Sequence, residues 1–133
     1  MSNYKCQMSN IKSMSNDKTQ KFDLAERTAR FSENIIEFIK EVLNNSVNQP
    51  LLNQLIRSAT SIGANYMEAD GAESKKDFNH KIGICKKEAK ETMYWLRILA
   101  KANPNKVDAS RKLLQEAHEL TLIFSAIINS SKN

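Results

Sequence analysis

The stretch SKKDFNHKIGICKKEAKETMYWLRILAKANP, residues 74–104, decides the fold. Its apolar residues recur at alternating spacings of four and three, which is the period of one buried helix face. Ser74 is a capping residue with Asp77 three positions later, and Asn103 with Pro104 ends the segment. The core row is Phe78, Ile82, Cys85, Ala89, Thr92, Leu96 and Leu99. The stretch therefore predicts one long amphipathic helix.

Two segments before this stretch show the same period. Asp23 is predicted to cap a helix over about 24–45, which the polar residues 44–46 end. The next helix is predicted to open at Asn48, the better capping residue before Pro50, and to close at Gly71. Their core rows are Leu24, Thr28, Phe31, Ile35, Phe38 and Val42, and Leu52, Leu55, Ala59, Ile62, Tyr66 and Ala69.

A fourth helical segment begins near Asn105 or Asp108. Its core row is Leu113, Ala117, Leu120, Phe124 and Ile127. The connections between segments are about 2–6 residues long, so sequential helices pack antiparallel. We therefore predict an all-α fold, an antiparallel up-down-up-down four-helix bundle over residues 23–133.

Composition agrees with one small domain. The chain has 133 residues, of which 41% are hydrophobic, with three Gly and two Pro, too few turn residues for a many-stranded sheet. Residues 1–22 are polar and lack apolar periodicity, so we predict a disordered leader there. Cys6 and Cys85 are far apart and read as free thiols. With no transmembrane run and no signal-peptide core, we expect a cytoplasmic protein without membrane contact.

The positive charge is unevenly distributed. The formal net charge is +5, yet residues 23–48 and 49–73 are each −2, whereas residues 74–103 carry eight basic and three acidic side chains. Several of these cations fall on one helix face, about 200° from the core row. We call this set the basic row: Lys76, Lys87, Lys90, Tyr94, Arg97 and Lys101.

The basic row has two interpretations. Spread over about 37 Å, it is long enough to contact several phosphates of RNA or DNA and gain affinity by releasing counterions. Tyr94 offers a ring on which an unpaired base can stack. A solvated lysine face is the plainer alternative, since the outer face of any bundle helix is charged. Side-by-side assembly of several copies favours the nucleic-acid interpretation.

A second apolar row lies about 100° from the core row of the same helix. It consists of Ile84, Trp95 and Ile98, and we call it the apolar row. One core row suffices for a bundle helix, so these residues either flank the same core or form a subunit interface, where Trp is favoured. The sequence leaves both open.

Catalytic and metal signals are weak. Small residues in RSATSIGANYMEA (57–69) favour close helix packing, and Arg57 or a Lys meeting Glu88 or Glu91 predicts a structural polar layer. His80 and His118 form no ligand pair, and the glycines build no phosphate loop. Cys85 lies in the core row. We therefore expect no catalytic residues, no metal, no cofactor and no enzyme activity.

Residues 51–99, LLNQLIRSATSIGANYMEADGAESKKDFNHKIGICKKEAKETMYWLRIL, resemble a known family. They are similar to the four-helix-bundle proteins named after the intervening sequences of bacterial 23S ribosomal RNA genes. The carrying motifs are QLIRSATSIGANYMEA, the helix start SKKDF and KEAKETMYWL. The resemblance extends more loosely over residues 24–128.

This resemblance implies a short bacterial cytoplasmic protein that assembles into a homopentameric ring and whose biochemical role is not established. A related bundle, the accessory variability protein of diversity-generating retroelements, is similarly pentameric, binds a reverse transcriptase and presents basic surface to nucleic acid. The family has no catalytic residues. Its motif positions here fit packing and interface roles: Arg57, Asn65, Glu68, Asp77, Phe78, Glu88, Glu91, Trp95 and Leu96.

Two functional hypotheses follow. The first is a non-enzymatic oligomeric bundle that binds RNA or DNA through the basic row. The second is a protein–protein adaptor or scaffold that meets a different protein through the apolar row, while the basic row only keeps it soluble.

Overall fold

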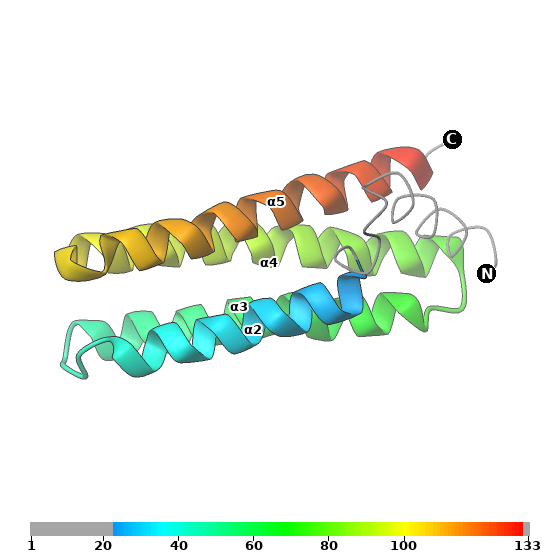
Figure 1. The fold of residues 1–133 in the computed structure, drawn as a ribbon. Helices are drawn as coiled ribbons and strands as arrows, with labels where there is room; N and C mark the ends of the chain where they lie inside the picture. Colours follow the sequence, from blue (N-terminus) through cyan, green and yellow to red (C-terminus); the bar gives the residue numbers. More distant parts are fainter. Residues whose placement is uncertain (1–22, 132–133) are drawn as a thin grey trace.

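The computed structural model describes residues 23–131, which form an antiparallel bundle of four α helices (Figure 1). The helices are α2 (Leu24–Glu41), α3 (Asn48–Asp70), α4 (Lys75–Ala102) and α5 (Val107–Ser131), and the short 3-10 turn η2 (Pro104–Lys106) precedes α5. The predicted all-α up-down-up-down bundle is therefore confirmed. The predicted leader, residues 1–22, lies outside the described residues.

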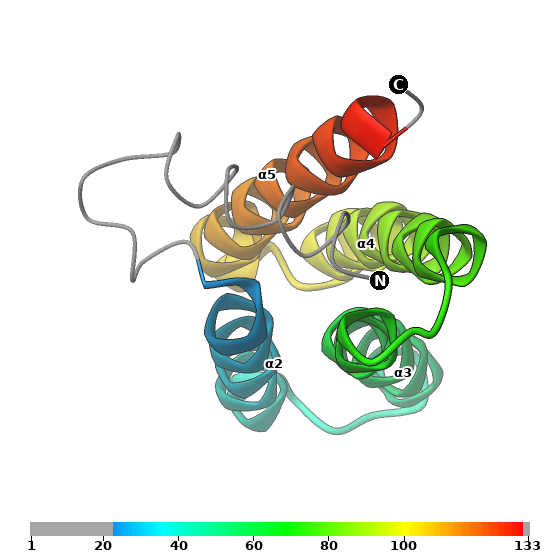
Figure 2. The ribbon, with the colours of Figure 1, turned by 90° about the vertical axis from the view of Figure 1, so that its right-hand side faces the viewer.

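The end-on view shows the helices arranged around the core in chain order (Figure 2). The longest helix, α4, packs extensively against both α3 and α5. In contrast, α2 lies mainly on α3 and has only a narrow contact with α5. The two ion pairs from Arg27 on α2 to Glu116 and Glu119 on α5, at 2.7 and 2.9 Å, bridge this narrow side.

The core contains the side chains that the 4/3 spacing selects. On α4 every member of the predicted row is buried, from Phe78 to Leu99. The other helices agree, except that Leu52 and Leu113 are half-buried against the core rather than inside it. The largest fully buried side chains include Phe31, Phe78 and Phe124, one from each of three helices. Removing this apolar surface from water is the main force that holds the helices together.

Two of the predicted helix starts carry the expected caps. The Asp23 carboxylate accepts a hydrogen bond from the Ala25 N–H at 3.1 Å. The Ser74 hydroxyl oxygen accepts one from the Asp77 N–H at 3.0 Å. Each cap satisfies a backbone N–H that has no partner within its own helix. Gly71 closes α3, as predicted.

The α2–α3 connection differs from the prediction at both ends. Helix α2 ends at Glu41, not near residue 45, because Val42 adopts an extended backbone that buries its side chain. Asn48 does not cap α3. The carboxamide oxygen of Asn45 accepts hydrogen bonds from the N–H groups of Val47 and Asn48, at 3.1 and 2.7 Å. Asn45 therefore organises the turn, and Asn48 is free to point inward.

Asn48 forms a buried amide pair with Asn103, which ends α4. Each side-chain amide donates to the carbonyl oxygen of the other at 2.9 Å. The remaining N–H of Asn48 donates to the Leu43 carbonyl oxygen, and that of Asn103 donates to the Leu99 carbonyl oxygen. Asn48 is 1% exposed and Asn103 9% exposed. The pair fastens the α2–α3 turn to the end of α4.

Gly63 marks a close approach of α3 to α2. A β-carbon at this position would lie 3.2 Å from the Thr28 hydroxyl oxygen and 3.3 Å from its β-carbon. Thr28 is held in place because its hydroxyl donates to the Leu24 carbonyl oxygen at 2.6 Å. The small-residue segment of α3 is therefore explained here by close helix packing.

Cys85 is a buried core thiol, and its burial makes the stability of the bundle sensitive to alkaline pH. Burial raises its pKa from 9.0 to about 12. The unfolded thiol ionises near pH 9 while the folded thiol stays protonated, so the free energy of unfolding falls as pH rises above about 9. Between pH 8 and 10.5, we expect the free energy of unfolding in urea to fall by about 1–2 kcal/mol more for the unmodified protein than for Cys85→Val. Parallel pH curves for the two proteins would contradict this.

Candidate nucleic-acid interface on α4

The basic row lies on the solvent side of α4, as predicted. All six members are exposed, and the Tyr94 side chain is 55% exposed. Helix α4 is 28 residues long, or about 42 Å, and shows no interruption along the row. The row is therefore a continuous surface on one rigid element.

The cations of the basic row are not neutralised by the rest of the bundle. Within residues 23–131, none of the six side chains forms an ion pair or a side-chain hydrogen bond. By contrast, Lys81 on the neighbouring face of α4 binds Glu68 of α3 at 2.7 Å. The charge of the row is thus available to an external anion.

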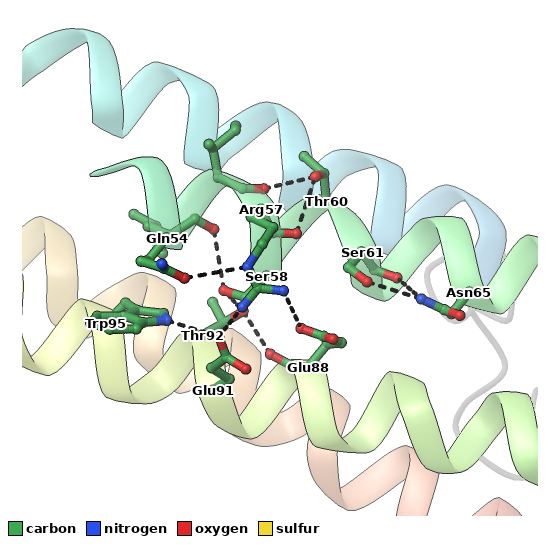
Figure 3. Close-up of polar contacts among 12 residues, drawn as sticks. Gln54, Arg57, Ser58, Thr60, Ser61, Asn65, Glu88, Glu91, Thr92 and Trp95 are labelled. Atoms are coloured by element: carbon green, nitrogen blue, oxygen red, sulfur yellow. Dashed lines mark hydrogen bonds and ion pairs between the residues drawn. The ribbon is translucent and has the colours of Figure 1, made fainter. Parts of the chain in front are cut away.

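Two of the three carboxylates of α4, Glu88 and Glu91, are held by Arg57 of α3 (Figure 3). The Arg57 guanidinium donates to Glu88 at 3.4 Å and also forms a direct hydrogen bond to Glu91. The Glu88 side chain is only 10% exposed, while Arg57 is 49% exposed. A single arginine therefore binds both carboxylates on the α3 side of the helix.

This arginine belongs to the polar layer that the sequence predicts between the two helices. Beneath it, the Ser58 and Thr92 hydroxyls form a buried hydrogen bond at 2.9 Å. That bond joins α3 to α4, whereas the bond from the Asn65 amide to Ser61, farther along α3, lies within one helix (Figure 3). These polar groups have partners, which fits a structural role rather than a ligand-binding one.

Trp95 connects the polar layer to the basic row. Its indole N–H donates to Glu91 at 3.1 Å, and its ring packs against the hydrophobic core. The Tyr94 ring meets the Trp95 ring edge-on, with centroids 5.0 Å apart and planes at 74°. Trp95 therefore flanks the core, as one of the two sequence interpretations expects, and supports the exposed tyrosine.

The other members of the apolar row differ from Trp95. Ile84 and Ile98 are half-buried, and they are not among the described side chains that pack against the core. The apolar row is thus divided: Trp95 contributes to the bundle, while the two isoleucines keep apolar surface at the α3-facing edge of α4.

The sequence reasoning missed a hollow on the basic face. A depression of about 310 Å³ is lined, among the described residues, by Gly83, Lys86, Lys87 and Lys90. Lys86 did not belong to the predicted row. The signal that points to it is Gly83, because a residue without a side chain leaves a gap between neighbouring lysines on a helix.

A second hollow lies between α2 and α5, where these helices have little contact. It has a volume of about 300 Å³ and includes Phe31 and Leu113 in its lining. Its charged lining residues are of both signs, with Arg27, Arg30 and Lys112 facing Glu116. This hollow therefore includes a carboxylate in its lining, unlike the lysine-lined hollow on α4.

The described residues show neither a metal-binding cluster nor a membrane-spanning helix. Residues 23–131 contain no group of three or more His, Cys, Asp or Glu side chains placed to hold a metal ion. His80 and His118 are both exposed. No helix in the described region has the length and apolar character needed to span a bilayer. The fold and the site together define an all-α four-helix-bundle protein with one unneutralised basic helix face.

Comparison with known families gives the particular assignment. The chain belongs to the 23S rRNA-intervening sequence protein family, whose sequence profile matches residues 20–126. The predicted family resemblance is thereby confirmed over nearly all of the described bundle. The search of curated proteins finds no match.

A solved structure shares the fold. It is a crystal structure of a protein of unknown function from Bacteroides thetaiotaomicron, described as a member of the S23 ribosomal protein family. The two chains are 31% identical, and the TM-score is 0.73. The match covers 79% of this chain and 97% of that chain.

Proposed function

We propose that this protein is a non-enzymatic, cytoplasmic bundle that binds the backbone of RNA or DNA through the basic row. The observation that carries the proposal is the absence of internal partners for five exposed cations on one face of α4 within residues 23–131. Arg57 adds support, because it binds the Glu88 and Glu91 carboxylates, so that neither forms an ion pair with a lysine of the basic row.

The basic row is better suited to binding the sugar–phosphate backbone of a nucleic acid than to recognising particular bases. Lysine ammonium groups contact phosphate as point charges and carry no sequence information. Tyr94 is the one row member with a ring, and its edge-on contact with Trp95 leaves ring surface exposed for one unpaired base. We therefore expect a preference for single-stranded or looped nucleic acid, with little dependence on sequence.

A salt series tests the proposal. Five phosphate contacts to a single strand give a slope of about −3.5 in log affinity against log salt concentration. Affinity for a labelled single-stranded RNA is then expected to fall about 100-fold between 50 and 200 mM salt. Fluorescence anisotropy with a mixed-sequence RNA and the matching DNA measures this. Absence of binding at 50 mM salt, or tight binding that salt does not weaken, would falsify the proposal.

We also propose a homo-oligomer in which the apolar row contributes to the subunit contact, with the pentamer as the assembly that the family resemblance suggests. The supporting observation is the position of Ile84 and Ile98 outside the core, beside a half-buried Trp95. A ring would place several basic rows on one particle, which raises the affinity for a long strand through simultaneous contacts.

The double variant Ile84→Asp/Ile98→Asp tests this contact, because neither residue packs against the described core and the bundle should remain folded. We expect light scattering to show a protomer where the unmodified protein shows an oligomer. Leu122→Asp, at an exposed apolar position of α5, is the matched control and should leave the molar mass unchanged. If the double variant is still an oligomer, these isoleucines do not form the subunit interface.

The same surface supports the second candidate, an adaptor for a different protein. In this case, a specific protein should stay bound after nuclease treatment. Its binding should be lost in Ile84→Asp/Ile98→Asp and kept when the charges of the basic row are reversed.

A further inference from the structure

Gly83 lies in the interior of α4, where no packing contact within the described bundle requires a glycine. Glycine is a poor helix former compared with alanine, so an interior glycine needs a compensating role. A β-carbon at Gly83 would meet no described atom within 4 Å. Gly63 is different, since its missing side chain makes room for Thr28. The space at Gly83 therefore faces outward.

The surroundings of this space are uniformly basic. Lys86, Lys87 and Lys90 line the hollow of about 310 Å³ above Gly83, and no carboxylate contributes to its described lining. None of the three lysines forms an ion pair within residues 23–131. On the same helix, the Glu91 carboxylate turns instead toward Arg57 and Trp95. The hollow thus presents three free ammonium groups around a backbone that can be approached closely.

We infer that the Gly83 hollow is the point where a nucleic-acid strand comes closest to the protein. A sugar–phosphate unit lies over the bare Cα of Gly83, and its flanking phosphates contact Lys86, Lys87 and Lys90. The backbone N–H groups here are used within the helix, so the lysines alone supply the donors. This assignment rests on the proposed function and adds Lys86 and Gly83 to the interface.

The charge pattern favours a nucleic acid over a second copy of the chain. The net-acidic helices of another copy, α2 and α3, both carry charges of two signs: α2 has Lys40 beside Glu37 and Arg30 beside Glu26, and α3 has Arg57 as well as Glu68, which already binds Lys81. A phosphodiester strand carries a negative charge at every unit and no cations. Three lysines with no acidic neighbour in the hollow match the uniform charge of the strand.

Two variants test the hollow without altering any member of the basic row. Gly83→Leu fills the space and leaves the charge unchanged, and we expect about tenfold weaker binding of the single-stranded RNA at 50 mM salt. Lys86→Gln is expected to reduce the salt slope by about 0.7, the value for one phosphate contact. Ala126→Leu on α5 and Lys112→Gln are matched controls at exposed positions and should bind as the unmodified protein does.

Folding is checked separately. Gly83→Ala should raise the melting temperature by about 4 °C, because nothing opposes the added methyl group and alanine favours the helix. A cooperative melt for Gly83→Leu shows that weaker binding does not come from unfolding.

The outcomes separate this inference from the proposed function. If the unmodified protein binds no nucleic acid, the proposed function fails. Suppose that it binds, that reversal of the basic row abolishes binding, and that Gly83→Leu and Lys86→Gln bind normally. The inference about the Gly83 hollow is then wrong, and the proposed function stands. If Gly83→Leu changes the molar mass in solution but not the RNA affinity, the occupant is a second copy and the inference is wrong.

Discussion

Asn103→Ala should lower the free energy of unfolding by about 3 kcal/mol, a large share of the stability of a small domain. The change leaves the buried Asn48 amide without one acceptor and one donor, and it removes the donor to the Leu99 carbonyl oxygen. Each unsatisfied buried polar group costs about 1–3 kcal/mol. Thermal unfolding should show a melting temperature lower by about 10 °C.

A double-mutant cycle distinguishes the pair from a general effect of losing polar groups. Asn48→Ala should be similarly destabilising, whereas the double variant should cost about 1–2 kcal/mol less than the sum of the single changes. Asn105→Ala, at an exposed position two residues away, is the control and should change stability by less than about 0.5 kcal/mol. Additive losses would show that the two amides act independently.

Reversing the basic row should abolish nucleic-acid binding. The variant Lys87→Glu/Lys90→Glu/Arg97→Glu/Lys101→Glu replaces four phosphate contacts with four repulsive charges, and we expect an affinity loss of at least about 100-fold at 50 mM salt. The four side chains are exposed and have no described ion pairs, so the bundle should keep its helical signal and a cooperative melt. The melting temperature should be somewhat lower, because positions 87 and 91 then carry like charges and positions 97 and 101 carry negative charges near the C-terminus of α4.

A second quadruple variant separates position from total charge. Reversal of four exposed cations on α2 and α5 changes the net charge by the same amount and leaves the basic row intact. These residues are Arg30, Lys40, Arg111 and Lys112. We expect this control to bind within about tenfold of the unmodified protein, since only long-range attraction is reduced. Equal losses in the two variants would assign binding to net charge rather than to α4.

The fold was predictable because the core rows are regular. The spacing from Phe78 to Leu99 fixes one buried face of α4 over six turns, and short connections leave little choice of topology. The helix ends were harder to place. Several polar residues near position 45 are suitable caps, and only the folded structure shows that Asn45 holds the turn while Asn48 is buried against Asn103.

The site was predictable as a face but not as a set of contacts. Helical periodicity places Lys87 and Lys101 in solvent without knowledge of any neighbour. It does not show that Arg57 binds both Glu88 and Glu91, because that contact joins residues more than 30 positions apart. The hollow at Gly83 was also missed, since the sequence does not separate a glycine that makes room for a neighbouring helix from one that faces solvent.

The packing of α4 between α3 and α5 has a consequence for the order in which the bundle opens. Amide hydrogen exchange should be slowest in the middle of α4, which is supported on two sides, and fastest in α2, which is shortest and relies mainly on α3. Local opening of α2 therefore leaves the cations of α4 at fixed separations. A ligand that binds them meets a helix backbone that is already ordered, so the entropy cost of binding falls on the exposed side chains and not on the backbone.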